Sequence, residues 1–265
     1  ATTRTNQLWP SGATGLNLTG SSANMKNKLG IWDGGRVLST HVEMIGRITQ
    51  KDNPSSNDNH ATHVAGTMIA SGVNPRARGM AYGIQGIIAY DFNNDNSEIA
   101  LEAADLLISN HSYSVISGWN FNSGQSRWEF HGRPNETEDY KFGYYDSDAK
   151  EWDRICYNAP FYLPVKSAGN YRNDNGPPVG TTYYRFNATG SLVNAGPRPE
   201  GISSNDGYDI LGTYSVAKNV MTVAAVNPLP YGTVTPSDIT ISSFSAWGPT
   251  DDGRIKPDIA ADGVS

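Results

Sequence analysis

Short apolar runs alternate along the chain with stretches in which apolar residues recur at the spacing of a helix. Over residues 60–71, small and apolar side chains fall on one helix face and Gly72 follows, so the pattern predicts a helix that ends there. The same spacing predicts helices over residues 95–107 and 147–158, and the apolar runs predict strands over residues 28–33, 86–90, 107–110, 162–167, 220–226 and 255–260.

This alternation of apolar strands with helices is typical of an α/β fold. Strands that are apolar throughout are buried on both faces, which predicts a doubly wound, mostly parallel sheet with helices on both sides. Residues 115–145 carry several Trp and Tyr side chains among polar residues, and residues 171–210 are rich in Asn, Gly and Pro. Both stretches are interpreted as long loops or insertions. No repeat or low-complexity linker divides the sequence, so residues 1–265 are expected to form one domain.

Composition excludes several classes of protein. A net charge of −6 without a basic run argues against binding to nucleic acid or to an anionic membrane. No run approaches 18 apolar residues, so no membrane span is expected. A single cysteine, Cys156, excludes an intrachain disulfide framework and a cysteine-based zinc site.

Three polar residues stand where predicted strands end or a predicted helix begins. Asp33 closes the first strand, His60 opens the first long helix, and Asn170 follows the strand that ends near Ser167. In open α/β sheets, functional side chains gather at the carboxyl ends of strands. A carboxylate, an imidazole base and an amide donor are three of the four parts of an acyl-transfer site.

The residues around these three positions resemble a known family. Residues 31–35 (Ile-Trp-Asp-Gly-Gly) match a strand-Asp-x-Gly box, and residues 60–67 (His-Ala-Thr-His-Val-Ala-Gly-Thr) match the box His-Gly-Thr-His-Val-Ala-Gly-Thr. Residues 167–170 are similar to Ala-Ala-Gly-Asn, residues 244–249 to Phe-Ser-Ser-x-Gly, and residues 256–260 to Lys-Pro-Asp-Ile. In this order, the boxes resemble the subtilisin-like serine proteases (subtilases, peptidase family S8) from residue 28 to the end of the chain.

The resemblance implies a fold and a role for individual residues. It implies the subtilisin-like α/β fold and a serine endopeptidase that cleaves extended polypeptides. Asp33 would orient His60, His60 would act as general base and then general acid, and the Asn170 side chain would donate to the oxyanion. Two segments would bind the substrate, namely Ser112, Tyr113 and Ser114, and Ser167, Ala168 and Gly169. Ser114 stands where many family members have glycine, which affects the depth of the neighbouring side-chain pocket.

The nucleophilic serine of the family is missing from the sequence. The family carries Gly-Thr-Ser after the Lys-Pro-Asp box, whereas this chain ends at Ser265 without that motif. We expect the serine on a separate or removed C-terminal fragment of the same protein, and we expect this chain alone to be inactive. The alternative is a catalytically dead pseudoprotease that binds peptides.

Other histidines and carboxylates have simpler interpretations. His63 follows His60 by one helical turn, which would suit a metal hydrolase, but no third ligand is evident. His41, His111 and His131 are expected to face solvent or lie in loops. The stretch from Asp91 to Glu102 imitates a calcium loop, yet a capping box of Asp95 and Glu98 accounts for it without calcium.

Cofactors and location are inferred only from the family. The resemblance requires no cofactor and allows a structural calcium ion, with no ligand set that can be assigned. The acidic, Asn-rich composition and the habit of the family suggest a secreted or cell-surface protein.

Overall fold

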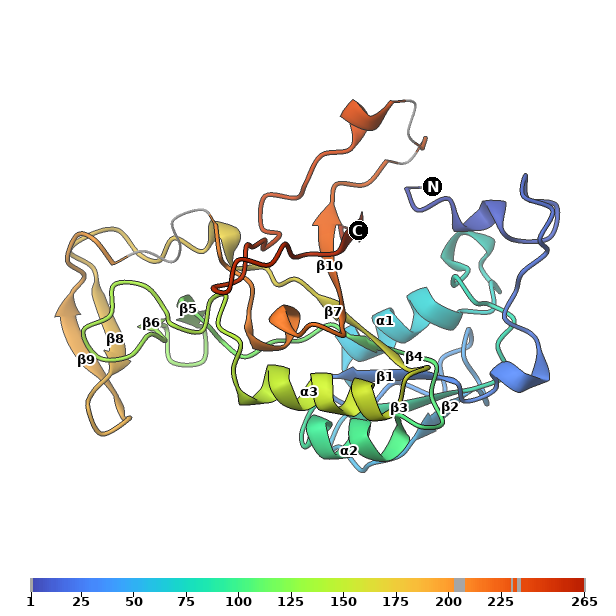
Figure 1. Ribbon diagram of the computed structural model, residues 1–265, viewed down its shortest axis with the longest axis horizontal. Coiled ribbons are helices and arrows are strands. Elements are labelled where there is room, and N and C mark those ends of the chain that lie inside the picture. Colours follow the sequence, from blue (N-terminus) through green and yellow to red (C-terminus); the bar gives the residue numbers. More distant parts are fainter. Residues whose placement is uncertain (1, 203–207, 230, 233–234, 265) are drawn as a thin grey trace. The chain divides into compact units, whose positions relative to one another are not determined.

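The computed structural model describes residues 2–202, 208–229, 231–232 and 235–264 (Figure 1). The chain forms two compact units, and each is described by itself. The first unit contains Ala1–Tyr113, Asp153–Lys166 and Pro228–Asp238, and the second contains Ser114–Trp152, Ser167–Asn227 and Ile239–Ser265. Ser265 lies outside the described residues.

Parallel strands form the centre of the first unit. The order is β2 (Ile48–Gln50), β3 (Ile87–Asp91), β1 (Leu29–Asp33), β4 (Ile108–His111) and β7 (Leu163–Ser167), the last paired through residues 163–166. Because these strands are parallel, their carboxyl ends share one edge of the sheet. Strand β2 was not predicted from the sequence; its three residues are too few to give a pattern.

Two helices cover opposite faces of this sheet. Successive side chains of a strand point to opposite faces, and Ile31 packs with Ala61 and Ala65 of α1 (Asn59–Ile69) in a buried apolar cluster. Its neighbour Trp32 points to the other face and bonds Glu98 of α2 (Asp95–Glu102). Figure 1 shows α1 and α2 on the two sides of β1 and β3. These are the helix-covered faces that the sequence predicts for an α/β fold.

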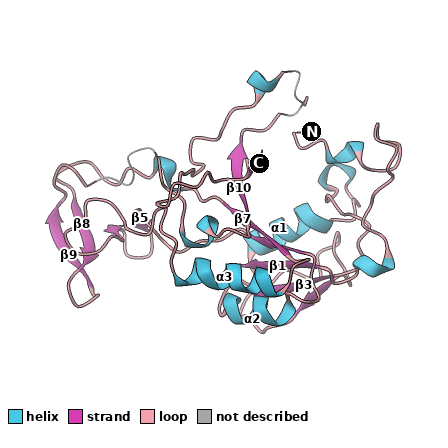
Figure 2. Cartoon of the chain, in the orientation of Figure 1, coloured by secondary structure: helices cyan, strands magenta, loops and turns pink. Residues whose placement is uncertain are grey.

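A four-stranded sheet and a pair of parallel strands mark the second unit, which is largely loop in Figure 2. The sheet has the order β5 (Trp119–Asn122), β6 (Arg127–Phe130), β8 (Thr182–Phe186) and β9 (Leu192–Pro197), and buried Trp119, Phe130 and Tyr183 pack together on it. The stretches predicted as loops, 115–145 and 171–210, therefore contain strands. Strand β10 (Met221–Val226) pairs in parallel with β11 (Ile259–Asp262).

Helix α3 (Ser147–Asn158) has the predicted bounds. The carboxylate of Asp146 accepts the backbone N–H groups of Asp148 and Ala149 at 3.0 Å each, which caps the start of the helix. Single 3₁₀ turns lie at Thr5–Gln7, Ala23–Met25, Pro75–Ala77, Tyr171–Asn173, Thr213–Val216 and Pro236–Asp238. None of the described helices has the length and the apolar character to cross a bilayer.

Three details of the prediction are wrong. Helix α2 ends at Glu102 instead of residue 107, because the N–H of Leu107 already bonds the carbonyl of Lys28 on the way into β4. The N-cap of α2 is Asn94 in a left-handed conformation without a side-chain cap, so the predicted capping box does not form. Strand β11 begins at Ile259 instead of residue 255.

Candidate active site

Asp33 is the last residue of β1, at the carboxyl edge of the parallel sheet. Its side chain is enclosed by the core, and the residue is only 2% exposed. Oδ1 accepts the N–H of Gly34 at 2.8 Å. Oδ2 is buried and has no hydrogen-bond partner within the part of the chain that the structure describes. Burial raises the pKa of Asp33, and the hydrogen bonds from His60 and Gly34 oppose that rise.

His60 stands in the first turn of α1. The helix begins here because Asp58 is its N-cap and accepts the N–H of Ala61 on Oδ1 at 2.7 Å. Ala61 and Ala65 bury one helix face against the sheet, which directs the imidazole of His60 to the edge, where its side chain is 58% exposed.

The two side chains meet. Nδ1 of His60 lies 2.7 Å from Oδ1 of Asp33. A carboxylate can only accept, so Nδ1 carries the proton and Nε2 keeps its lone pair. The pair is thus a buried acid that orients an exposed base, which is the arrangement needed for proton abstraction from a nucleophile.

Asn170 ends the Ser167–Asn170 segment of the second unit. The N–H of Ala168 bonds the carbonyl of Val223, and the N–H of Ala246 bonds the carbonyl of Gly169, both at 2.9 Å. Gly169 has φ 111°, and a Cβ there would lie 3.1 Å from the Tyr171 ring, so the position requires glycine. Asn170 itself is exposed at the end of this hydrogen-bonded segment.

The predicted substrate-binding residues Ser112, Tyr113 and Ser114 follow directly on β4. Ser112 and Tyr113 belong to the first unit, and Ser114 begins the second. The hydroxyl of Ser112 donates to the Asn110 side chain at 3.0 Å, and the hydroxyl of Tyr113 donates to Asp95 at 2.8 Å. All three residues are half-buried.

One prediction about histidines is corrected. His111 does not face solvent: it is fully buried, stacked on Trp32 and bonded to the hydroxyls of Ser109 and Tyr113. Burial lowers its pKa well below the usual value, and Lys166 adds to the effect. Sequence reasoning also overlooked Lys166, although a lysine inside the strand 163–167 was a visible anomaly.

Among the described residues, one group of three potential metal ligands is present: Asp33, Asp58 and His60, with ligand atoms within 4.8 Å of one another. His63 is not part of it. Asp33 holds His60 and Asp58 caps α1, so both carboxylates have structural partners already. In the stretch that imitates a calcium loop, Asp91 accepts the N–H of Asn93 and Glu102 accepts the hydroxyl of Tyr90.

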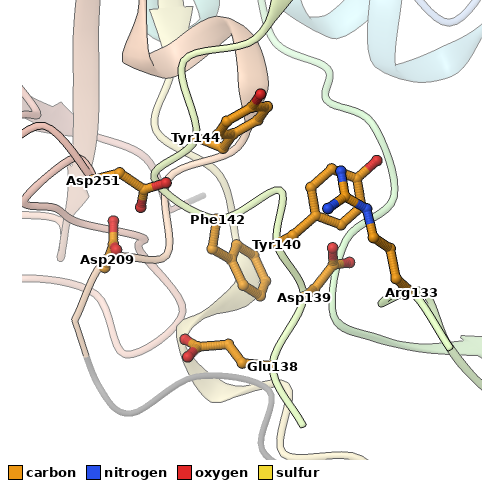
Figure 3. A pocket seen from close by; sticks show the side chains of 8 residues that line it. All are labelled: Arg133, Glu138, Asp139, Tyr140, Phe142, Tyr144, Asp209 and Asp251. Atoms are coloured by element: carbon orange, nitrogen blue, oxygen red, sulfur yellow. The ribbon is translucent and has the colours of Figure 1, made fainter. Parts of the chain in front are cut away.

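The aromatic residues between Trp119 and Tyr145 serve two purposes. Trp119 is buried in the small sheet and fixes the segment to the second unit. Tyr140 and Tyr144 instead line a cavity of about 330 Å³ (Figure 3). Asp209 and Asp251 face each other on one side of it, and Arg133 stacks over the Tyr140 ring at 3.6 Å. The remaining lining residues are Glu138, Asp139 and Phe142.

Comparison with known proteins places the chain in a family. The sequence model described as "Subtilase family" matches residues 17–265. The CspB protease of Clostridium perfringens is similar in structure over 99% of this chain and 79% of its own, with 14% identity and a TM-score of 0.57. The epidermin leader peptide processing serine protease of Staphylococcus aureus is similar over 98% of this chain and 56% of its own, with 17% identity and a TM-score of 0.50.

A third structure, the prenylagaramide maturation protease PagA, is covered to 62% of its length, with 18% identity and a TM-score of 0.48. The chain thus spans less than two thirds of two of these three proteins. No curated protein matches the sequence. At these identities, the structural likeness concerns the fold, which is the mostly parallel α/β fold predicted.

Proposed function

Because the chain belongs to the subtilase family, we propose that it supplies the acid and the base of an Asp-His-Ser triad in a serine endopeptidase. The observation that carries the proposal is the 2.7 Å contact between buried Asp33 and exposed His60. The substrate is an extended polypeptide that binds as an added strand, and the segments proposed to bind it are Ser112, Tyr113 and Ser114, and Ser167, Ala168 and Gly169.

The chemistry follows from the two side chains. The serine Oγ attacks the scissile carbonyl carbon while its proton passes to Nε2 of His60. The Asn170 amide donates to the oxygen that becomes negative. His60 then gives the proton to the leaving amine as the C–N bond breaks, and water hydrolyses the acyl-enzyme with His60 again as base. Asp33 keeps the imidazole in the required tautomer throughout.

The nucleophile of this proposal is outside the 265 residues. It comes from a C-terminal segment of the same protein that carries Gly-Thr-Ser, and the chain by itself is inactive. Intact-mass analysis of the purified protein tests this point: a companion segment or a longer chain with Gly-Thr-Ser supports it, and a gene product that ends at Ser265 contradicts it.

A fluorophosphonate probe, which reacts only with an activated serine, tests the mechanism. The complete protein is expected to be labelled, and His60→Ala to lower the labelling rate by about 10⁵-fold or more. His63→Ala is the matched control, because His63 lies one turn further along α1 and does not contact Asp33; it should label at the wild-type rate. Peptide binding without labelling would identify the pseudoprotease, and loss of activity on chelation without labelling would identify a metal hydrolase.

A further inference from the structure

Lys166 is a fully buried lysine on strand β7. It stands opposite His111 in the register of β7 with β4. Its Nζ donates to the backbone carbonyl of Tyr113, the central residue of the proposed substrate-binding segment. A charged group inside a core is costly unless specific partners compensate for lost water.

Burial disfavours the charged form of this side chain. Burial lowers the pKa of Lys166 to about 7, although the negative charges of Asp95 and Asp33 raise it. A methionine would fill the same space without that desolvation. Packing alone therefore does not account for a lysine here, whereas the bond to the Tyr113 carbonyl does.

The other end of Tyr113 is also fixed. Its hydroxyl donates to the carboxylate of Asp95, which is 7% exposed, at 2.8 Å. The same hydroxyl oxygen accepts from Nδ1 of His111 at 3.0 Å. Nε2 of His111 then accepts from Ser109 at 2.6 Å, whose Oγ accepts from the Tyr162 hydroxyl at 2.5 Å. Each group in this chain donates to the next, and the last hydrogen bond is accepted by the Asp95 carboxylate. This order of donors and acceptors requires a neutral His111 with its proton on Nδ1.

The direction of the Tyr113 carbonyl determines that of its neighbours. In an extended chain, the N–H and C=O of successive residues point alternately to the two edges. In the extended conformation that strand addition requires, a Tyr113 carbonyl held by Lys166 leaves the backbone groups of Ser112 and Ser114 on the opposite edge. That edge is where an added substrate strand would find its hydrogen-bond partners.

We propose that Lys166 is a positioning residue that holds the Tyr113 carbonyl inward and thereby presents the backbone of Ser112 and Ser114 to the substrate. The inference rests on the proposed protease function and extends it: the alignment of the substrate strand depends on a buried amine that touches neither the substrate nor the reacting atoms. It applies to substrates that are long enough to pair with this segment.

Substrate length is the readout that separates positioning from general stability. The complete protease is assayed on a chromogenic tetrapeptide anilide and on the corresponding single-residue anilide. Lys166→Met is expected to lower kcat/KM for the tetrapeptide by about 10-fold to 100-fold, the effect of losing a hydrogen bond from a charged donor. For the single residue, which does not pair with the segment, the change is expected to stay within about threefold on the same reasoning.

Lys256→Met is the matched control. Lys256 is also buried and donates to a backbone carbonyl, that of Val220, at 2.7 Å. Its replacement should change both substrates by the same factor. Tyr113→Phe is the second variant. It removes the hydroxyl and its bonds to Asp95 and His111 but keeps the backbone carbonyl, so kcat/KM for the tetrapeptide should fall about threefold relative to that for the single residue.

The outcomes are distinct. If Lys166→Met keeps the wild-type near-ultraviolet circular dichroism and the ratio of the two kcat/KM values stays within twofold of wild type, the positioning role is wrong. Should Lys166→Met fail to fold, an unchanged ratio in Tyr113→Phe overturns it equally. A wild-type protein that neither reacts with the fluorophosphonate nor cleaves either anilide refutes the protease function itself.

Discussion

The indole N–H of Trp32 donates to Oε2 of Glu98 across 3.0 Å, which joins the residue before Asp33 to helix α2. Burial raises the pKa of Glu98 to about 7, although the bond from Trp32 lowers it, and nearby Asp52, Asp91 and Asp95 raise it further. Glu98 thus changes charge near neutral pH and is bonded to the residue that precedes Asp33 in β1.

The stability of the protein is expected to fall as pH rises from about 4.5 to 7. The folded state binds a proton on Glu98 more tightly than the unfolded state does, so the stabilising contribution is present at low pH and is lost through this interval. We expect a loss of about 1–3 kcal/mol in the free energy of unfolding from this group. Urea titrations at several pH values measure it.

Glu98→Gln should remove this part of the pH dependence, because the amide oxygen still accepts from Trp32 and cannot ionise. Glu102→Gln, one turn further along α2, is the control and should leave the slope between pH 5 and 7 as in wild type. An equal slope in Glu98→Gln and wild type would contradict the assignment.

Glu43 is expected to act in the opposite direction. Its carboxylate accepts from the Ser71 hydroxyl and from the backbone N–H groups of Gly72, Val73 and Asn74, which lower its pKa to about 2. Stability from this group is therefore complete above pH 4.5 and is lost as pH falls toward 2. In Glu43→Gln, amide hydrogen exchange at residues 72–74 should be faster than in wild type at pH 6. As the pH falls and Glu43 becomes protonated in the wild type, the difference in exchange rate between the two proteins should shrink. Protection unchanged in the variant would show that the charge is unimportant.

Gly143 should tolerate alanine poorly. It has φ 68°, and a Cβ would lie 1.9 Å from Oδ1 of Asp209 and 2.5 Å from Oδ1 of Asp251, the two carboxylates that face each other in Figure 3. Gly180 has φ 87° with nothing within 4 Å, so Gly180→Ala measures backbone strain alone, about 1–2 kcal/mol. Gly143→Ala is expected to cost about 1–3 kcal/mol more in thermal or urea unfolding. Equal losses in the two variants would mean that the carboxylates move away freely.

Asp33→Asn should reduce kcat/KM of the complete protease by about 10⁴-fold with little change in fold, because an amide can favour the wrong tautomer of His60. The matched control is Asp91→Asn, since Asp91 stands opposite Asp33 in the register of β3 and its carboxylate accepts the N–H of nearby Asn93. Its activity should remain within a few-fold of wild type. Comparable losses in both variants would place the effect in the sheet edge and not in the contact with His60.

The features that follow from local pattern were predictable. The helix around Ala61 and Ala65 and the strand ending at Asp33 were predicted because their apolar periodicity reports burial directly. The helix at 95–107 was predicted too long because Leu106 and Leu107 continue an apolar spacing, while the N–H of Leu107 already bonds the carbonyl of Lys28 just before β1. The small sheet of β5, β6, β8 and β9 was missed because its strands are short, polar and half-exposed, and because β6 pairs with β8 across a long sequence separation.

At the site, chain order and residue type were enough to single out Asp33 and His60, whose side chains lie 2.7 Å apart, and their catalytic roles stay predictions. The role of Asn170 stays a prediction. The network from Tyr162 to Asp95 could not be predicted from the sequence. Its members come from β4 and the residue two positions after it, from α2, and from the residue just before β7, and the register of β4 with β7 brings these segments together.

Because Asp33 and His60 differ in exposure, they differ in their accessibility to chemical reagents. A dissolved reagent can reach the imidazole, whose side chain is 58% exposed, but not a carboxylate that the core encloses. Alkylating agents directed at histidine should therefore modify His60 in the native protein, whereas a water-soluble carbodiimide should spare Asp33 until the protein unfolds. The protection of Asp33 from such a reagent is thus a direct measure of whether the sheet edge beneath the base is intact.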